Sequence, residues 1–330
     1  MSEDCFEKEN ELALRKRVRR ITSESFYGVD LYLFMFTGLQ FLLYWEYTLA
    51  ARLTGGILPE EPTDFFYGVM ILIATLSSLV LAWLYFSGKA ERGVLFEGPS
   101  VYREIFRVRE KLPLTRLVSY ACMIFLMQIL FSYIVSIFEL LFNYFGYTLE
   151  YSEAMNAEYN TSWTLMCYAI LIGPFAEEAV YRGFLMRSLE KNGRLFALIV
   201  SGVVFGLMHG DFQQSMFTMA AGLVFGYVAM RYSLWYAFAL HVFNNGILGE
   251  LWVWFTGQVS DTVYIIVALI LLVLSAIVTV RTIRRNGADA KKWLLEDKSR
   301  PGAWGSLVNL WVILFLAFSI TEIIFSISPM

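Results

Sequence analysis

Apolar residues occur along this chain in runs that are too long for the core elements of a soluble domain. Nine stretches of the sequence approach the roughly 20 apolar residues that a helix needs to cross a bilayer. They cover residues 31–51, 66–87, 117–143, 163–186, 195–210, 214–230, 233–255, 262–280 and 304–327. This pattern predicts an all-α fold, a polytopic transmembrane helix bundle with about eight or nine spans.

The composition supports this prediction, since 58% of the 330 residues are apolar, 17% are charged and the mean hydropathy is +0.56. Soluble domains are about half apolar and about a quarter charged. We therefore expect an integral membrane protein in contact with the lipid bilayer. The net charge of −3 gives no reason to expect a nucleic-acid partner. The cysteines, Cys5, Cys122 and Cys167, are too far apart in the sequence to indicate a disulfide framework or a thiolate metal site.

Nearly all Lys and Arg residues fall in every second connection between the predicted spans. These basic segments are residues 1–30, 88–116 and 187–194, Arg231, and residues 281–303. Because basic loops stay on the cytoplasmic side of a membrane, we expect a multi-pass protein with a cytoplasmic N-terminus. The predicted organisation is a cytoplasmic tail over residues 1–30 followed by a single membrane domain over residues 31–330.

The fourth predicted span contains charges where each one is costly inside a bilayer. Glu178 and Arg182 stand four residues apart with the acid first, the favourable order for a helical ion pair, so a structural role explains both. Glu177 is left without such a partner. Pro174 should kink the span and free backbone carbonyls nearby. The sequence therefore predicts that Glu177 lines a cavity.

Both histidines of the chain lie within predicted spans, His209 in the fifth and His241 in the seventh, with Asn245 one helical turn beyond His241. The rise of about 1.5 Å per residue puts Glu177 and His241 at similar depths below the basic segments, with His209 deeper. We therefore expect Glu177, His209 and His241 to meet in one cavity, within a catalytic core over about residues 163–255. We also expect this cavity to be reached from the cytoplasmic half, where basic segments would guide an anionic C-terminus toward it.

These polar residues form three motifs in a fixed order: Glu177-Glu178-x-x-x-Arg182, Phe205-x-x-x-His209 and His241-x-x-x-Asn245. Together they resemble the CAAX prenyl protease type II and bacteriocin-processing (CPBP or ABI) family of intramembrane proteases. The resemblance extends from about residue 163 to residue 249.

The resemblance implies endopeptidase activity on a peptide or protein in or at the membrane, lipidated or not. It implies that Glu177 and His209 activate a water molecule, and that His241 with Asn245 polarises the scissile carbonyl or holds the oxyanion. Glu178 and Arg182 would support the site. The chemistry of the residues agrees, since a poorly hydrated carboxylate holds a proton readily and can serve as a general base. A histidine and an amide one turn apart can donate to an oxyanion.

Three alternatives stay open at the level of sequence, one for the mechanism and two for the function. Glu177, His209 and His241 also form a two-His, one-Glu set of the kind that binds zinc. We favour the metal-free mechanism because no His-Glu-x-x-His helix holds these ligands together. Intramembrane Glu and His residues also occur in proton-coupled transporters, and the fold is compatible with a non-catalytic immunity or scaffold protein. A polar network that only packs helices needs fewer such residues than this chain has.

Overall fold

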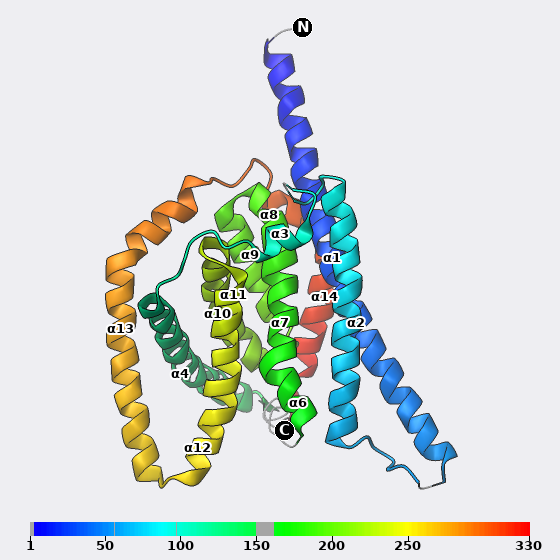
Figure 1. Ribbon diagram of the computed structural model, residues 1–330, viewed down its shortest axis with the longest axis vertical. Coiled ribbons are helices and arrows are strands. Elements are labelled where there is room, and N and C mark those ends of the chain that lie inside the picture. Colours follow the sequence, from blue (N-terminus) through cyan, green and yellow to red (C-terminus); the bar gives the residue numbers. More distant parts are fainter. Residues whose placement is uncertain (1–2, 56, 97, 150–161) are drawn as a thin grey trace.

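The computed structural model describes residues 3–55, 57–96, 98–149 and 162–330, and most of this part of the chain is helical (Figure 1). Most predicted spans correspond to one helix each, although those over residues 195–210 and 304–327 extend beyond the ends of their helices. These helices are α1 (Glu3–Leu53), α2 (Asp64–Glu91), α4 (Leu114–Tyr144), α9 (Arg194–Leu207), α10 (Phe212–Arg231), α13 (Asp261–Glu296) and α14 (Leu310–Phe325). The short helix α3 (Val101–Phe106) lies in the basic connection before α4. The prediction of an all-α membrane bundle is confirmed.

The fourth and seventh predicted spans are rods of consecutive helical segments. The fourth rod consists of α6 (Trp163–Cys167), η2 (Tyr168–Ile172), α7 (Gly173–Glu177), η3 (Glu178–Met186) and α8 (Arg187–Leu189), followed by the 3₁₀ turn η4 (Glu190–Asn192). The seventh rod consists of α11 (Leu234–Val242), η5 (Phe243–Leu251) and α12 (Trp252–Gln258). Segments η2, η3 and η5 are π-helical. Because π-helical turns are rare and occur frequently at functional sites, the two rods are candidate positions for a functional site.

Four helices of the described part are long and apolar enough to cross a membrane: α1 from Asn10 onward, α2, α4 and α13. Helices α9 and α14 are apolar but shorter. The last predicted span is also shorter than expected, because the 3₁₀ turn η6 (Trp304–Leu307) is separate from α14, whose first turn is capped by Asn309. The exact number of spans therefore stays a prediction.

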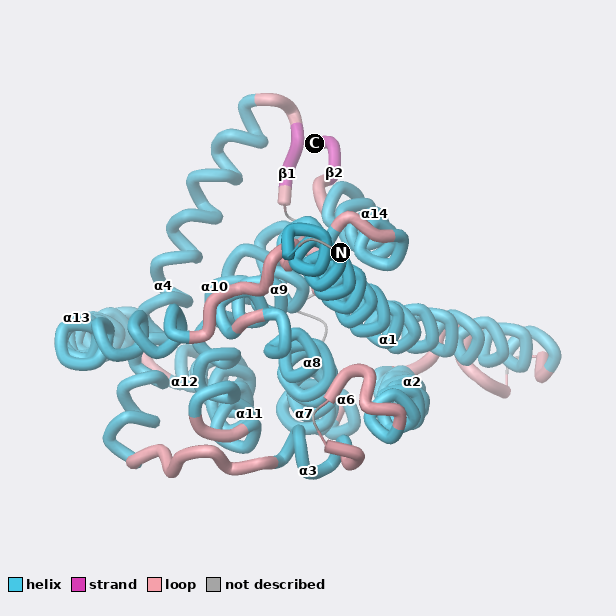
Figure 2. The backbone as a smooth tube through the Cα atoms, turned by 90° about the horizontal axis from the view of Figure 1, so that it is seen from above, coloured by secondary structure: helices cyan, strands magenta, loops and turns pink. Residues whose placement is uncertain are grey.

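The fourth rod and helices α9 and α10 occupy the middle of the bundle, with α1 and α2 on one side and α4 and α13 on the other (Figures 1 and 2). The core around them is rich in aromatic side chains that are almost completely buried, including Tyr181, Phe184, Phe205 and Phe225. The largest buried side chain is nevertheless a charged one, Arg182. Because burying a charge is costly, the Arg182 guanidinium needs partners of opposite charge or hydrogen-bond acceptors nearby.

Helix α1 runs without a break through residue 30, where the tail was predicted to end. Its residues 18–33 include a buried face, whereas the following part exposes large apolar side chains such as Phe41 and Trp45. Hydroxyl contacts fix the buried part: Ser25 Oγ lies 2.6 Å from Ser188 Oγ, and Thr22 Oγ1 lies 2.7 Å from Ser306 Oγ. Part of the predicted tail is thus docked on the bundle, and the position of the membrane boundary along α1 stays a prediction.

The predicted basic connections gather at the end of the bundle where α1 begins, and the C-terminus lies at the opposite end (Figure 1). At that opposite end, strand β1 (Tyr147–Thr148) pairs antiparallel with strand β2 (Ser328–Pro329). If successive spans cross the membrane in alternating directions, every second connection must lie at the same end, as the basic connections do. Which of the two ends faces the cytoplasm stays a prediction.

Helices α9 and α10 pack unusually closely because glycines face each other across their contact. A β-carbon on Gly206 would lie 2.8 Å from both the backbone nitrogen of Met219 and the backbone oxygen of Ser215. A β-carbon on Gly222 would lie 3.2 Å from the Cα of Gly202. This close approach is the small-residue packing expected between membrane helices, and it fixes the end of α9 that precedes His209.

We expect Gly206→Ala to destabilise the protein by about 1–3 kcal/mol, because the added carbon meets backbone atoms that cannot rotate away. Thermal unfolding of the detergent-solubilised protein should show a lower Tm. Gly38→Ala is the matched control, since a β-carbon there meets nothing within 4 Å. Equal Tm values for the two variants would contradict the packing described for α9 and α10.

Candidate active site

A proline interrupts the backbone hydrogen bonds of the fourth rod. In η2 the N–H of Gly173 donates to the carbonyl of Tyr168, five residues earlier. The next donor in this series would be residue 174, but proline has no N–H, so the carbonyl of Ala169 loses its backbone partner. Asn245 Nδ2 from the seventh rod donates to that carbonyl at 2.9 Å. The carbonyl that the sequence predicted to be freed near Pro174 is thus bound by a candidate catalytic residue.

Hydrogen bonds hold both the oxygen and the nitrogen of the Asn245 side-chain amide. Asn244 Nδ2 donates to Asn245 Oδ1 at 3.0 Å, while Asn245 Nδ2 is held by the Ala169 carbonyl. An amide nitrogen carries two hydrogens, so one N–H of Asn245 remains for another acceptor. This side chain therefore ties the two rods together and still has a donor to offer.

Glu178 and Arg182 form the predicted ion pair, with Nη1 and Oε1 3.1 Å apart and both side chains fully buried. The Arg182 guanidinium lies over the Phe205 ring, with its Cζ 3.8 Å from the ring centroid, and Nη2 donates to the Gly222 carbonyl at 3.4 Å. Burying two charges is costly unless they are paired, so each member depends on the other.

His241 lies between the two glutamates, a contact that the sequence did not predict. Its Nδ1 is 3.0 Å from Glu178 Oε1, and its Nε2 is 3.6 Å from Glu177 Oε2. The ring stacks on Phe225 with centroids 5.0 Å apart and an interplanar angle of 20°. Glu178 therefore supports His241 as well as Arg182.

The hydrogen bonds set which nitrogen of each histidine can react. Glu178 as a carboxylate only accepts, so Nδ1 of His241 carries the proton of that bond and Nε2 is free to take or give a proton. His209 Nδ1 lies 2.8 Å from the carbonyl oxygen of Phe205, which also only accepts. Nε2 of His209 is therefore the acceptor nitrogen in the neutral ring. Both histidines thus have an oriented ring and one available nitrogen.

His209 lies in the turn after α9, not inside a helix as predicted, because α9 ends at Leu207 and Gly210 follows with a φ of +65°. Helix α9 has 14 residues and is therefore about 21 Å long, which is less than the roughly 30 Å of a bilayer core. The turn that follows α9 can therefore lie within the membrane. The Phe205 ring is in T-shaped contact with both histidines: its centroid is 4.9 Å from that of His209 and 5.7 Å from that of His241.

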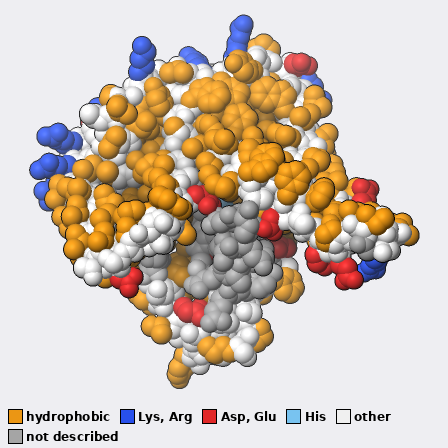
Figure 3. Space-filling view, turned by 60° about the horizontal axis from the view of Figure 1, so that its bottom comes forward, with side chains coloured by type: hydrophobic (Ala, Val, Ile, Leu, Met, Phe, Trp, Pro, Cys, Tyr) orange, Lys and Arg blue, Asp and Glu red, His pale blue; other side chains and the backbone are white. Residues whose placement is uncertain are grey.

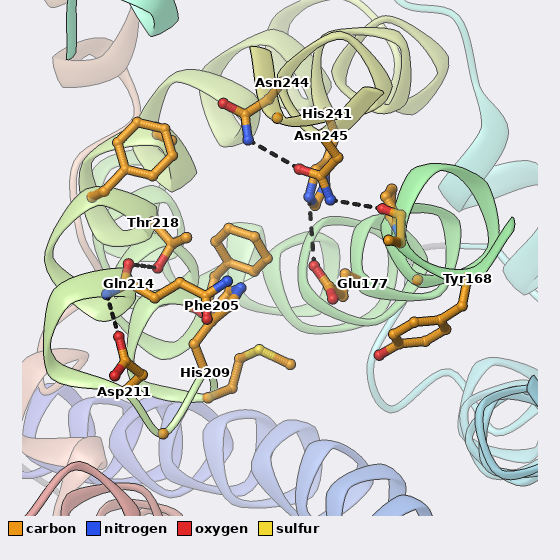
Figure 4. A pocket seen from close by; sticks show the side chains of 18 of the residues that line it. Tyr168, Glu177, Phe205, His209, Asp211, Gln214, Thr218, His241, Asn244 and Asn245 are labelled. Atoms are coloured by element: carbon orange, nitrogen blue, oxygen red, sulfur yellow. Dashed lines mark hydrogen bonds and ion pairs between the residues drawn. The ribbon is translucent and has the colours of Figure 1, made fainter. Parts of the chain in front are cut away.

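A cavity of about 670 Å³ brings together Glu177, His209, His241 and Asn245 (Figure 4). Its size is within the range of ligand-binding pockets. Among these four, Glu177 and His241 are in short contact with each other, and His209 and Asn245 occupy other parts of the wall. Glu178 and Arg182 are not among the residues of the wall and lie behind His241. The Glu177 side chain remains 16% exposed, so it is accessible from the cavity.

The cavity extends away from the end of the bundle where α1 begins. Its wall continues to Gly210 and Asp211 in the α9–α10 turn, to Glu250 in η5, and to Glu322 and Ser326 at the end of α14. The prediction placed the entrance toward the end that carries the basic connections, whereas this wall extends toward the other end; the side from which a substrate enters stays a prediction. Counting residues along a helix gives depth but does not show on which side neighbouring helices leave space. Acidic side chains also surround the middle of this end of the protein, and Lys and Arg lie mainly at its margin (Figure 3).

The sequence analysis did not predict the acidic and amide residues in the part of the cavity wall that extends beyond the three motifs. Asp211 had a recognisable signal, since it caps α10 by accepting from the backbone N–H of Gln214 at 2.7 Å. Glu322 gave none, because it lies on α14, far along the chain from the motifs. Gln128 on α4 and Asn244 beside the third motif also line the cavity.

The segment that contains the candidate site is similar to known proteins. Residues 159–247 match the sequence model of a family described as type II CAAX prenyl endopeptidase Rce1-like. All three motifs lie in this segment, so the resemblance predicted from them is confirmed over it. The chain is also similar to "Putative membrane peptidase YdiL" of Bacillus subtilis (strain 168), with 30% identity over 77 residues.

The alignment with the Bacillus protein covers 23% of this chain and 32% of that relative, so the similarity spans about a third of the relative's length. No solved structure matches the chain. The segment matched by the family contains the fourth rod, α9, α10 and the start of the seventh rod, which are the elements that position the cavity. Together with the apolar helices, these similarities support an integral membrane protein.

Proposed function

We propose that this integral membrane protein is an endopeptidase that hydrolyses a peptide bond of a membrane-associated substrate with a water molecule activated by Glu177 and His209. The observation that carries the proposal is the placement of His241 between Glu177 and Glu178, at the wall of a cavity that His209 and Asn245 also line. The match of residues 159–247 to an endopeptidase family supports the same reaction class.

In the proposed reaction, Glu177 is the general base. Its carboxylate takes one proton from the attacking water, while Nε2 of His209 accepts a hydrogen bond from the O–H that remains and so orients the oxygen. The water oxygen then bonds to the scissile carbonyl carbon, and the carbonyl oxygen becomes an oxyanion. When the carbon–nitrogen bond breaks, the proton held by Glu177 passes to the leaving amine.

His241 and Asn245 are the proposed donors to the oxyanion. With Nδ1–H bound to Glu178, a second proton on Nε2 makes His241 an imidazolium that donates into the cavity, and Glu178 stabilises its charge. The N–H of Asn245 that does not bind Ala169 is the second donor. Arg182 holds Glu178 in place through their ion pair.

The alternative zinc set predicted from the sequence comprises Glu177, His209 and His241. In the described part of the chain, no three or more His, Cys, Asp or Glu side chains are grouped so that they could hold a metal ion. Nε2 of His241 is close to Glu177, and His209 is not grouped with these two residues. We therefore derive no step through a metal and propose the metal-free mechanism.

The proposed substrate is a peptide or protein in or at the membrane, with or without an attached lipid. Membranes from cells that express the protein should contain new peptide termini that are missing when His241→Gln is expressed instead. Gln keeps a donor for Glu178, so this variant should fold. Labelling of new N-termini followed by mass spectrometry provides the measurement. Identical sets of termini in the two membranes would contradict the proposal.

A further inference from the structure

A second cavity, of about 260 Å³, lies among α4, α9, α10 and α13 and shares no lining residue with the candidate active site. We call it the lateral groove. Its wall is mainly apolar and includes Tyr120 on α4, Leu198 on α9, Leu223 and Tyr227 on α10, and Ile283 and Gly287 on α13. Leu223 is 39% exposed and Ile283 is 55% exposed, so the lateral groove opens at the outer surface of the bundle.

The lateral groove lies where α13 changes from apolar to basic. Residues 262–280 contain no charged residue, whereas residues 281–292 contain five Lys or Arg and one Asp. Such a change marks the level at which a membrane helix leaves the hydrocarbon core. Ile283 and Gly287 lie just past this point, and Leu223 lies two helical turns deeper in the bundle than Arg231, where α10 ends. The lateral groove therefore reaches from the headgroup level into the hydrocarbon core.

Three arginines stand beside the lateral groove, each one helical turn from a residue that lines it. The pairs are Arg116 with Tyr120 on α4, Arg194 with Leu198 on α9, and Arg231 with Tyr227 on α10. Residues four apart share one face of a helix. Helices α4 and α9 begin at the end that carries the basic connections, and α10 ends there (Figure 1). In all three helices the arginine is therefore the residue nearer to that end, and we call the three the arginine cluster.

Two guanidinium groups of the arginine cluster lie over one tryptophan of α13. The Cζ of Arg194 lies 4.5 Å, and that of Arg231 lies 4.9 Å, from the centroid of the Trp293 ring. The Trp293 ring in turn lies 5.9 Å from the ring of Tyr227, which lines the lateral groove. These contacts hold the two cations at the basic end of the groove.

Nearby carboxylates do not neutralise the arginine cluster completely. Arg116 donates from Nη1 to the hydroxyl of Tyr232 at 3.3 Å, and it forms no ion pair within the described part of the chain. The other two arginines have one carboxylate partner each, Glu110 at 3.1 Å from Arg231 and Asp297 at 4.0 Å from Arg194. Because a guanidinium has five N–H donors, the cluster retains donors and positive charge for an anion.

We infer that the lateral groove binds an anionic phospholipid of the surrounding bilayer. Part of one acyl chain lies against the apolar wall, and the phosphate lies in the arginine cluster, since guanidinium groups match phosphate oxygens well. Basic pockets between membrane helices bind anionic headgroups in this way. A zwitterionic headgroup fits less well, because its own cation is repelled by the cluster. The lipid takes no part in the proposed reaction.

The preference can be measured on the wild-type protein after removal of co-purified lipid. Native mass spectrometry compares phosphatidylglycerol with phosphatidylcholine of identical acyl chains, added together in equal amounts. We expect the Kd for one bound phosphatidylglycerol to be at least about tenfold lower, equivalent to about 1.4 kcal/mol. Phosphatidylglycerol should also raise the Tm in detergent more than phosphatidylcholine does, because a ligand of the folded state stabilises it. This difference in Tm should shrink as salt is added.

One variant tests the headgroup contact. Arg116→Gln should reduce the preference for phosphatidylglycerol to less than about threefold, because it removes the arginine that has no ion pair. The matched control is Arg103→Gln, which removes an exposed arginine on α3 that does not line the lateral groove. This control should keep the wild-type preference.

A second variant tests the acyl-chain contact. Gly287→Leu should weaken the binding of both lipids by at least about tenfold, because the new side chain fills the lateral groove. A β-carbon on Gly287 would meet only the side chain of Ile283, at 3.5 Å, so this variant should fold. Gly38→Leu on α1 is the matched control, because a β-carbon there meets nothing within 4 Å.

Equal binding of the two lipids by the wild type would overturn the inference without the use of any variant. A preference that survives Arg116→Gln would also overturn it, as would lipid binding that is the same in Gly287→Leu and Gly38→Leu. A protein dimer that Gly287→Leu dissociates would assign the lateral groove to a second copy of this chain instead of a lipid.

Discussion

Replacing Glu177 by Gln is expected to lower peptide cleavage by at least about 10²-fold, because it removes the general base while keeping the size and polarity of the side chain. The amide fits in the place of the carboxylate beside Nε2 of His241, so the fold should be retained. Cleavage rates and Tm values of reconstituted wild type and variant provide the measurement. Glu46→Gln, an exposed carboxylate on α1, is the control and should leave both quantities unchanged.

The same variant separates the proposed function from its alternatives. A scaffold or immunity protein would keep its function in Glu177→Gln, whereas a proton-coupled transporter would lose the pH dependence of uptake. Either result, together with no cleavage by the wild type, would exclude the endopeptidase.

Chelation separates the metal-free mechanism from the zinc alternative. We expect a chelator to leave cleavage unchanged. Stoichiometric zinc in the purified, active protein, lost in Glu177→Gln and in His209→Ala, would overturn the metal-free mechanism. So would activity that chelation removes and added zinc restores.

Glu178→Ala is expected to have the largest effect on stability, about 3–5 kcal/mol, because it leaves the Arg182 guanidinium buried without its counter-ion. The same change removes the acceptor of His241 Nδ1, so activity should fall by about 10–100-fold beyond any loss of folded protein. Chemical or thermal unfolding measures the first effect, and kcat per folded molecule measures the second.

The double variant Glu178→Ala/Arg182→Met distinguishes the two roles of Glu178. Removing both charges should recover much of the stability, since an apolar replacement of a buried ion pair is often well tolerated. Activity should stay low, because His241 still lacks its acceptor. The surface pair Arg231–Glu110 is the matched control, and Glu110→Ala should cost no more than about 1 kcal/mol. Recovery of full activity in the double variant would show that Glu178 supports the site only through Arg182.

The sequence predicted those features that depend only on residues close together in the chain. The spacing of Glu178 and Arg182 predicted their ion pair, and Pro174 predicted a carbonyl in need of a donor. Long apolar runs predicted the helices. Each of these features depends on residues within about one helical turn, so helix geometry alone is sufficient.

Contacts between helices were beyond sequence reasoning. The bond from His241 to Glu178 joins residues that are 63 positions apart, and its register depends on how the two rods pack. Glu322 reaches the cavity because α14 packs against the α9–α10 turn, which no pattern in either segment specifies. The direction in which the cavity extends was likewise undetermined, because it depends on the gaps that neighbouring helices leave.

The bond between Asn245 and the Ala169 carbonyl has a consequence for biosynthesis. Asn245 is synthesised 76 residues after Ala169, a delay of roughly 4–15 seconds at ordinary translation rates. During this interval the carbonyl has no donor from Asn245, and an unsatisfied backbone group in lipid costs several kcal/mol. The rod around Pro174 is thus incomplete until the ribosome has delivered the seventh rod. A nascent chain that terminates before Asn245 therefore keeps this carbonyl without the Asn245 donor.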